Sequence, residues 1–237
     1  MMEPTLMNFI IFISVILCVI TSLFAAFIIY RRDRKSQEHR FFTVFFIGLA
    51  GFVAFYLFLQ YPILKDYSYF FQLLSLSTAV LGLFLFYFTL AHEGSLRIEV
   101  LLGCSVSVYI LPILSVILHP YQFIVESYGY ELNVDLWFIT FVSIIYAIFG
   151  FYALLGLGWL YKKTTKQPLK HKIALVFLGL LIMSISGVLS FTVIPVVINV
   201  HILKPFGYIA FIIGILIMTS AFKGKENNEK KNAVNEN

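Results

Sequence analysis

Hydrophobic residues fill seven long stretches of the chain, and charged residues lie almost wholly between them. Glu99 and Lys204 are the charges that fall within a stretch, and each lies in a terminal turn. An α-helix needs about 20 apolar residues to cross a hydrocarbon core roughly 30 Å thick, where a charge costs on the order of 3 kcal/mol. The pattern predicts transmembrane helices over Met7–Tyr30, Phe41–Tyr61, Tyr67–Ala91, Ile98–Leu118, Leu136–Tyr161, Ile173–Asn199 and Leu203–Phe222.

Composition agrees with this pattern and excludes a soluble domain. The 237 residues are 60% apolar, with a mean hydropathy of +0.92, and the stretches lack the polar faces that soluble helices need. We therefore expect an all-α membrane protein, with one seven-helix bundle over residues 1–222. Residues 223–237 are too polar to fold on their own and are expected to form a disordered basic tail.

Lysine and arginine alternate between segments in a way that predicts the orientation. Segments on one predicted side hold 15 of these residues, and segments on the other side hold 2. Positively charged loops stay in the cytoplasm, so we expect the amino terminus outside, the carboxyl terminus inside and a multi-pass plasma-membrane protein. The richest loops are Arg31–Arg40 and Lys162–Lys172.

The longest predicted outer loop, residues 119–135, reads HPYQFIVESYGYELNVD. Apolar and polar residues alternate in Phe123–Glu126 and Tyr130–Val134, which is typical of strands. With Gly129 between them, the pattern favours a small β-hairpin. A loop without regular structure explains the sequence equally well.

Reactive chemistry finds little support in this sequence. The predicted membrane interior has no Asp, Glu or His, which proton relays and intramembrane metal hydrolases require. The five histidines are scattered, and no phosphate-binding loop or zinc motif is present. The net charge of +5 lies at membrane ends and needs no nucleic acid to explain it. We expect a protein that is not an enzyme and uses neither metal nor cofactor.

Uncharged polar residues gather in the predicted outer halves of the third, fifth and sixth helices. One interpretation is a ligand pocket that opens to the outside between these helices. The other is tight helix packing, because small residues recur at steps of three and four along each helix and let backbones approach. The pocket would be lined by Gln60, Gln72, Ser75, Thr78, Thr140, Ser143, Ser186 and Ser190.

Two prolines lie inside predicted helices. Pro112 falls within the fourth helix and Pro195 near the outer end of the sixth. Proline removes a backbone donor and bends a helix. Each residue is therefore a hinge candidate, with a fixed bend that improves packing as the alternative.

Several motifs follow one another in a recognisable layout. The third helix ends in FYFTLAHEG, HPYQF leads into the outer loop, the sixth helix ends in FTVIPVVIN and the last opens with LKPFGYIAF. This layout resembles the seven-helix amino-terminal membrane region of prokaryotic sensor histidine kinases. The resemblance implies a unit that receives a signal and passes it to a cytoplasmic output domain.

No kinase domain follows the last predicted span. We therefore expect a membrane unit that acts alone, signals through a separate partner or was separated from a longer protein. The predicted function is a non-enzymatic sensor, with a small external ligand and a cytoplasmic partner that contacts Arg31–Arg40, Lys162–Lys172 and the tail. A small transporter or a lipid-handling protein is the alternative.

Overall fold

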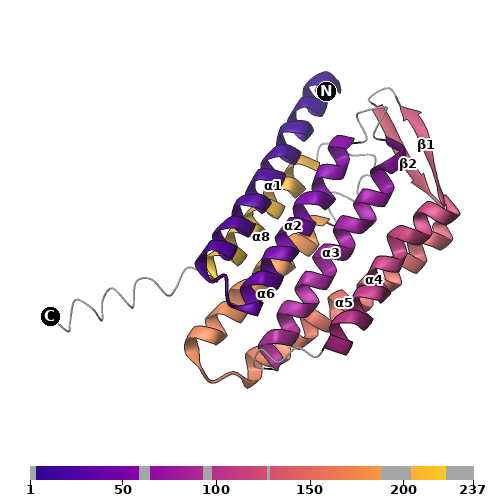
Figure 1. Cartoon of the computed structure of the whole chain (residues 1–237). Coiled ribbons are helices and arrows are strands. Elements are labelled where there is room, and N and C mark those ends of the chain that lie inside the picture. Colours follow the sequence, from indigo (N-terminus) through magenta and orange to yellow (C-terminus); the bar gives the residue numbers. More distant parts are fainter. Residues whose placement is uncertain (1–3, 59–64, 93–97, 127–128, 188–203, 223–237) are drawn as a thin grey trace. The chain divides into compact units, whose positions relative to one another are not determined.

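A computed structural model describes residues 4–58, 65–92, 98–126, 129–187 and 204–222, and these are almost entirely helical (Figure 1). The chain divides into two compact units, Met1–Ala153 and Leu154–Asn237. The boundary falls inside helix α5, Leu136–Lys163.

Six helices of the described residues are long and apolar enough to cross a membrane. They are α1 (Pro4–Arg32), α2 (Gln37–Phe58), α3 (Lys65–Ala91), α4 (Ile98–Leu118), α5 (Leu136–Lys163) and α6 (Gln167–Gly187). These apolar helices are those of a multi-pass, all-α membrane protein.

The last helix, α8, is shorter. It comprises 17 residues, Lys204–Ser220, and at 1.5 Å per residue it spans roughly 25 Å, less than the hydrocarbon core. Residues 188–199 of the predicted sixth span lie outside the described residues. The seventh crossing and the orientation therefore stay predictions.

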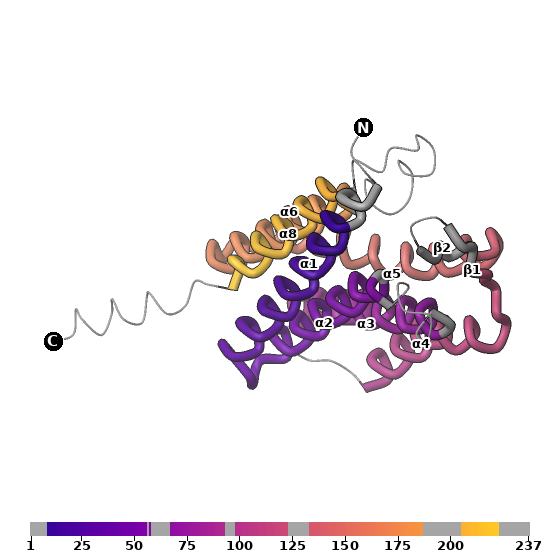
Figure 2. The backbone as a smooth tube through the Cα atoms, turned by 90° about the horizontal axis from the view of Figure 1, so that it is seen from above, coloured from indigo at the N-terminus to yellow at the C-terminus, as the bar shows by residue number. Residues whose placement is uncertain are grey.

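In the first unit, helices pack on their neighbours in chain order, α1 on α2, α2 on α3 and α3 on α4 (Figures 1 and 2). The buried core contains large aromatic side chains, among them Phe42, whose ring contacts those of Phe46 and Phe86. Edge and tilted contacts of this kind add to the energy of burial.

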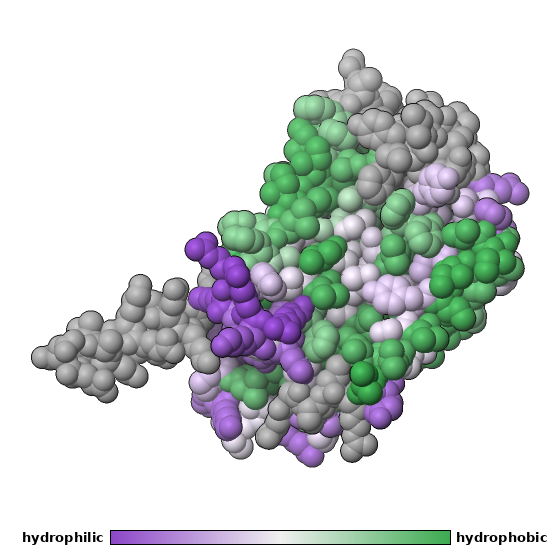
Figure 3. Space-filling model, viewed as in Figure 1, coloured by the Kyte–Doolittle hydropathy of each residue, from purple (hydrophilic) through white to green (hydrophobic). Residues whose placement is uncertain are grey.

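The outer helices of this unit present apolar faces. Phe24 and Phe27 of α1 and Leu102, Val106 and Ile113 of α4 are more than half exposed, and hydrophobic residues cover the sides of both helices (Figure 3). Helices that are apolar both inside and outside a bundle are typical of membrane spans. These faces are the surface that lipid would contact.

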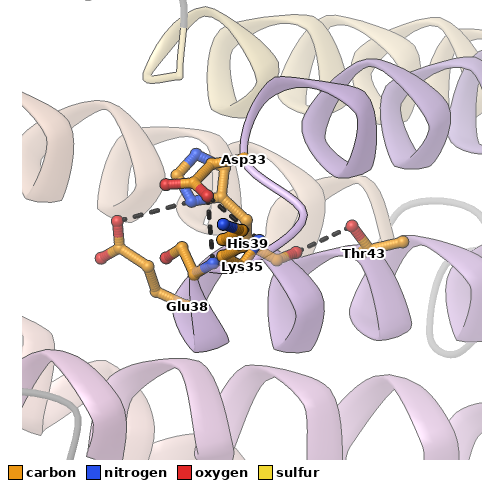
Figure 4. A network of polar contacts seen from close by, with 6 residues as sticks. Asp33, Lys35, Glu38, His39 and Thr43 are labelled. Atoms are coloured by element: carbon orange, nitrogen blue, oxygen red, sulfur yellow. Dashed lines mark hydrogen bonds and ion pairs between the residues drawn. The ribbon is translucent and has the colours of Figure 1, made fainter.

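Both basic loops are shorter than predicted, because helices continue into the charged sequence. α1 extends to Arg32 and α2 begins at Gln37, so residues 33–36 alone connect them. The Asp33 carboxylate accepts hydrogen bonds from the backbone N–H groups of Lys35 and Ser36, each 3.1 Å long (Figure 4). Such Asx contacts fix a tight turn.

Likewise, α5 extends to Lys163 and α6 begins at Gln167. The predicted loop boundaries at 31–40 and 162–172 were wrong, because apolar sequence marks membrane depth and does not mark helix ends. Long cationic side chains continue a helix while keeping their charge in water.

The segment after α4 forms the β-hairpin, so the alternative of an irregular loop is wrong. Strand β1 (Tyr121–Glu126) pairs antiparallel with β2 (Gly129–Val134), and Tyr121 lies opposite Val134. Gly129 is the first residue of β2, opposite Glu126, so this strand begins one residue before the predicted alternation. The hairpin lies at the end of the first unit opposite the α1–α2 turn (Figure 1).

Two local features connect the hairpin to its helices. His119 has a φ of 43° and is followed by Pro120, a combination that ends α4. The Asp135 backbone N–H donates to the Pro120 carbonyl over 2.8 Å, and the Asp135 carbonyl accepts from Phe138 and Ile139 at the start of α5. The hairpin is therefore closed at its base by backbone hydrogen bonds.

In the second unit, α6 and α8 lie side by side (Figure 2). A Cβ atom on Gly179 would lie 2.7 Å from the Gly214 carbonyl oxygen, and one on Gly214 would lie 2.8 Å from the Gly179 carbonyl oxygen. Glycine at both positions lets the two backbones approach, as in other membrane helix pairs.

Candidate functional site

One face of α3 packs closely on the backbone of α2. A Cβ atom on Gly48 would lie 2.7 Å from the Ser75 carbonyl oxygen and 2.8 Å from the Ala79 Cα. A Cβ atom on Gly82 would lie 2.9 Å from the Phe41 carbonyl oxygen, and the side chain nearest to Gly51 is that of Ser75. The predicted stripe of small residues on α3 is therefore a packing surface for α2.

Another part of α3 carries a buried hydroxyl contact that joins three helices. The fully buried Ser77 hydroxyl donates to the Val108 carbonyl of α4 over 3.0 Å. It also lies 2.9 Å from the Tyr146 hydroxyl of α5, which in turn donates to the Leu73 carbonyl of α3 over 3.1 Å. We call Ser77, Tyr146 and the Leu73 and Val108 carbonyls the hydroxyl node.

Pro112 explains why the Val108 carbonyl needs a partner from another helix. In an α-helix this carbonyl would accept from the N–H group of the residue four positions later. That residue is Pro112, which lies inside α4 and has no N–H group. A buried acceptor without a partner costs about 1–3 kcal/mol, so the Ser77 hydroxyl takes the place of the missing donor.

The node has fewer protons than contacts. Ser77 and Tyr146 each bring one hydroxyl proton, and three oxygen pairs lie within 3.1 Å. With the Ser77 proton on the Val108 carbonyl, the Tyr146 proton is divided between the Ser77 Oγ and the Leu73 carbonyl. The node therefore allows two hydrogen-bond arrangements that need little movement of the backbone.

A second hydroxyl contact lies beside the node. The Thr78 hydroxyl donates to the Leu74 carbonyl over 2.8 Å and lies 3.0 Å from the Tyr109 hydroxyl. Since the Thr78 proton is used within α3, Tyr109 of α4 is the donor in this pair. α3 and α4 are thus joined by two hydroxyl contacts in adjacent positions.

Apolar and aromatic residues surround the node and extend to the hairpin. Tyr146 belongs to one buried cluster with Tyr69 and Phe138. The Tyr69 ring lies 6.2 Å from that of Phe138 and 5.2 Å from that of Tyr121, the first residue of β1. Tyr121 and Val134, which pair at the base of the hairpin, both pack on this cluster. A continuous set of contacts thus leads from the hairpin to Tyr146.

The predicted pocket residues of the first unit fall into different surroundings. Thr78 lies beside the node, Gln72 is half-buried on α3 and Ser75 packs toward α2. Thr140 and Ser143 are exposed on α5, and the Thr140 hydroxyl donates within its own helix to the Leu136 carbonyl. Among the residues of this unit that the structure describes, no predicted pocket residue forms a hydrogen bond with another.

The remaining predicted positions lie elsewhere. Ser186 belongs to the second unit, is fully buried and donates to the Gly207 carbonyl, so it joins α6 to the start of α8. Gln60, Ser190 and the hinge candidate Pro195 lie outside the described residues. Pro112 is buried, and its carbonyl accepts from the Ser115 hydroxyl over 2.7 Å.

Sequence reasoning missed Ser77 and Tyr146 of the node and Tyr109 beside it. None of the three is among the predicted pocket residues. A usable signal was present in Pro112, because a proline inside a membrane helix leaves the carbonyl four positions earlier without a donor. A buried serine or tyrosine on a neighbouring helix is the expected partner.

Comparison with models of protein families and with curated proteins gives no match. The resemblance to the membrane region of sensor histidine kinases therefore depends on the layout and motifs of the sequence.

Proposed function

We propose that the protein is a non-enzymatic membrane sensor that receives its signal at the hairpin end of the first unit. The observation that carries the proposal is the path of contacts from Tyr121 through Tyr69 and the surrounding cluster to Tyr146. A change at the hairpin would press on side chains that also surround the hydroxyl node. The node is where α3, α4 and α5 meet through polar contacts.

The node suits a relay because its two arrangements differ by the acceptor of one proton. In a low-dielectric interior a lost hydrogen bond is costly, so a shift that exchanges one acceptor for another has a smaller cost than one that leaves a group unpaired. A signal changes the populations of the two arrangements if its affinity for one differs from its affinity for the other. This change would displace α3, α4 or α5, and the displacement would reach the end of the first unit opposite the hairpin.

The input and output of this sensor follow the sequence predictions. Gln72 and Thr78 are the predicted pocket residues that lie nearest in sequence to the node, and they are the first places to look for a small ligand. The basic segments Arg31–Arg40 and Lys162–Lys172 would relay the change to a partner in the cytoplasm. A property of the bilayer, such as its thickness, is the alternative to a small ligand as the input.

A distance measurement tests the relay. Spin labels at the exposed positions Leu102 of α4 and Ile148 of α5 would report the α4–α5 distance in nanodiscs of different thickness and in the presence of screened small polar and lipid-like ligands. We expect at least one condition to shift the distance distribution. Tyr146→Phe should abolish the shift, and the exposed control Thr140→Val should keep it.

Two outcomes would contradict the proposal. If Tyr146→Phe keeps every shift seen in the parent, the node is not the relay. If flux or lipid-scrambling assays in liposomes show transport that depends on Tyr146 while the α4–α5 distance never changes, the alternative of a transporter or lipid-handling protein is correct.

A further inference from the structure

An apolar groove lies between α1 and α2 in the first unit. Four side chains of each helix line it, and its volume is about 480 Å³, within the roughly 300–1,000 Å³ of small-molecule sites. The residues recur at steps of three and four on both helices, so the groove follows the two helices lengthwise. They are Leu23, Ala26, Phe27 and Tyr30 of α1, and Arg40, Thr43, Val44 and Ile47 of α2.

The inner surface of the groove is apolar over most of its length. Ala26 and Thr43 are buried at its floor, while Leu23, Phe27 and Ile47 form partly exposed walls. The Thr43 hydroxyl donates to the His39 carbonyl over 2.7 Å, so its polar group is already used within α2 (Figure 4). Leu23 and Tyr30 are seven residues apart, a rise of about 10 Å. The groove would hold the first part of a hydrocarbon chain.

A fixed arginine stands at one end of this groove. The Arg40 Nε donates to the Arg34 carbonyl over 2.7 Å, which holds the guanidinium at the α1–α2 turn. Within the described residues no hydrogen bond occupies the Nη groups of Arg40. The Arg34 guanidinium lies over the Tyr30 ring, 5.4 Å from its centroid. Arg40 and Tyr30 therefore line this end of the groove, and the Arg34 guanidinium lies on the Tyr30 ring.

The turn as a whole is cationic. Residues 31–40 hold five Lys and Arg residues and two acids, a net charge of +3. Both acids have contacts of their own, since Asp33 accepts from two backbone N–H groups and Glu38 lies 3.6 Å from His39 (Figure 4). Hydrophilic residues gather where α1 ends and α2 begins, directly beside apolar surface (Figure 3). This combination matches an amphiphile with an anionic head.

We propose that the groove binds one anionic phospholipid, with an acyl chain between α1 and α2 and its phosphate on the guanidinium groups of Arg40 and Arg34. Guanidinium is the side-chain group best suited to phosphate, because it donates two parallel hydrogen bonds. Basic sites between membrane helices are places where anionic head groups bind. This site is independent of the proposed sensing function.

The test uses the full chain in micelles with equal amounts of phosphatidylglycerol and phosphatidylcholine, followed by native mass spectrometry of the lipids retained. We expect the wild type to retain one phosphatidylglycerol in preference to phosphatidylcholine. Arg40→Gln should lower this preference about fivefold, as one basic residue near an anionic surface contributes on that order. Lys162→Gln removes a charge outside the groove and should leave the preference within twofold.

A second pair of variants tests the apolar part. Leu23→Trp fills the groove at the end away from Arg40 and should reduce lipid retention, whereas Ile20→Trp enlarges an exposed residue of α1 that does not line the groove and should not. Both positions are exposed, so circular dichroism and elution volume should match those of the wild type. Equal retention of the two lipids by the wild type would overturn the proposal. Equal effects of Arg40→Gln and Lys162→Gln, or of Leu23→Trp and Ile20→Trp, would also overturn it. The same holds if the Leu23→Cys variant cross-links into a homodimer and this dimer retains no lipid.

Discussion

Two surfaces of α3 meet their neighbours in opposite ways. Toward α2, the contact is between backbones, with Gly48 and Gly82 leaving no room even for a methyl group. Toward α4 and α5, the contact is made by side chains, and the hydroxyl groups of Ser77 and Tyr146 bond to each other and to backbone carbonyls among large aromatic and aliphatic residues. One helix thus has a tightly fitted surface and a surface with a choice of hydrogen-bond partners.

The difference has a physical consequence for motion. Backbones in direct contact cannot slide without a steric clash, because packed interfaces deform little. Hydroxyl groups can exchange acceptors by small rotations, and the node offers more acceptors than protons. We therefore expect α2 and α3 to move as one body, while α4 and α5 shift against them.

The largest effect is expected from a substitution in the closely packed contact between α2 and α3. Gly48→Ala places a methyl group against the backbone of Ser75 and Ala79, and we expect it to lower the free energy of unfolding by about 3 kcal/mol, the upper part of the range for overpacking. Unfolding in mixed micelles by added denaturing detergent measures it. Gly150→Ala is the matched control, since a Cβ atom there meets nothing within 4 Å. A loss for both variants would show that the cost is not one of close packing.

The next effect tests why the node exists. Ser77→Ala leaves the Val108 carbonyl without a donor, and we expect a loss of about 2 kcal/mol in the free energy of unfolding. Pro112→Ala restores the N–H group within α4, so Ser77→Ala should cost less in that background. A double-mutant cycle should give a coupling of roughly 1 kcal/mol between the two positions. Additive losses would mean that Pro112 does not create the need for Ser77.

A smaller effect concerns the third helix of the node. Tyr146→Phe keeps the ring in its cluster and removes the hydroxyl proton, so we expect a loss of about 1 kcal/mol, in the range measured for hydrogen bonds between membrane helices. Tyr109→Phe, which removes the partner of Thr78, should lose a similar amount. A loss near 3 kcal/mol for Tyr146→Phe would instead indicate a rigid structural bond and weaken the contrast between the two surfaces.

The smallest effect is expected on the exposed side of α5. Thr140→Val and Ser143→Ala change polar groups that the structure leaves exposed, and each should alter the free energy of unfolding by less than about 0.5 kcal/mol. The same unfolding titration measures both. A loss well above this limit would show that these residues contact a partner, as the predicted pocket requires.

Much of the fold was predictable because hydrophobic length decides it. The apolar stretches located α1 to α5 closely, and alternation in Tyr130–Val134 predicted a strand. The helix ends were not predictable from apolarity, since Arg32 and Lys163 are helical.

The site was harder to predict for a different reason. Steps of three and four identify a helix face and do not say what the face meets. Ser75 packs toward α2, Ser143 is exposed and Ser186 bonds to the start of α8, although all three lay on similar stripes. The node also depends on a backbone acceptor, the Val108 carbonyl, which no residue pattern identifies without Pro112.

The central claim is that the Ser77 hydroxyl replaces the hydrogen bond that Pro112 removes from Val108. Infrared spectroscopy of the full chain with a ¹³C=¹⁸O label on the Val108 carbonyl measures this directly, because a carbonyl that loses a hydrogen bond absorbs at higher frequency. We expect an upward shift in Ser77→Ala, no shift in the neighbouring control Thr78→Ala, and a return toward the parent frequency in Ser77→Ala with Pro112→Ala. A Val108 frequency that is unchanged in Ser77→Ala would contradict this claim.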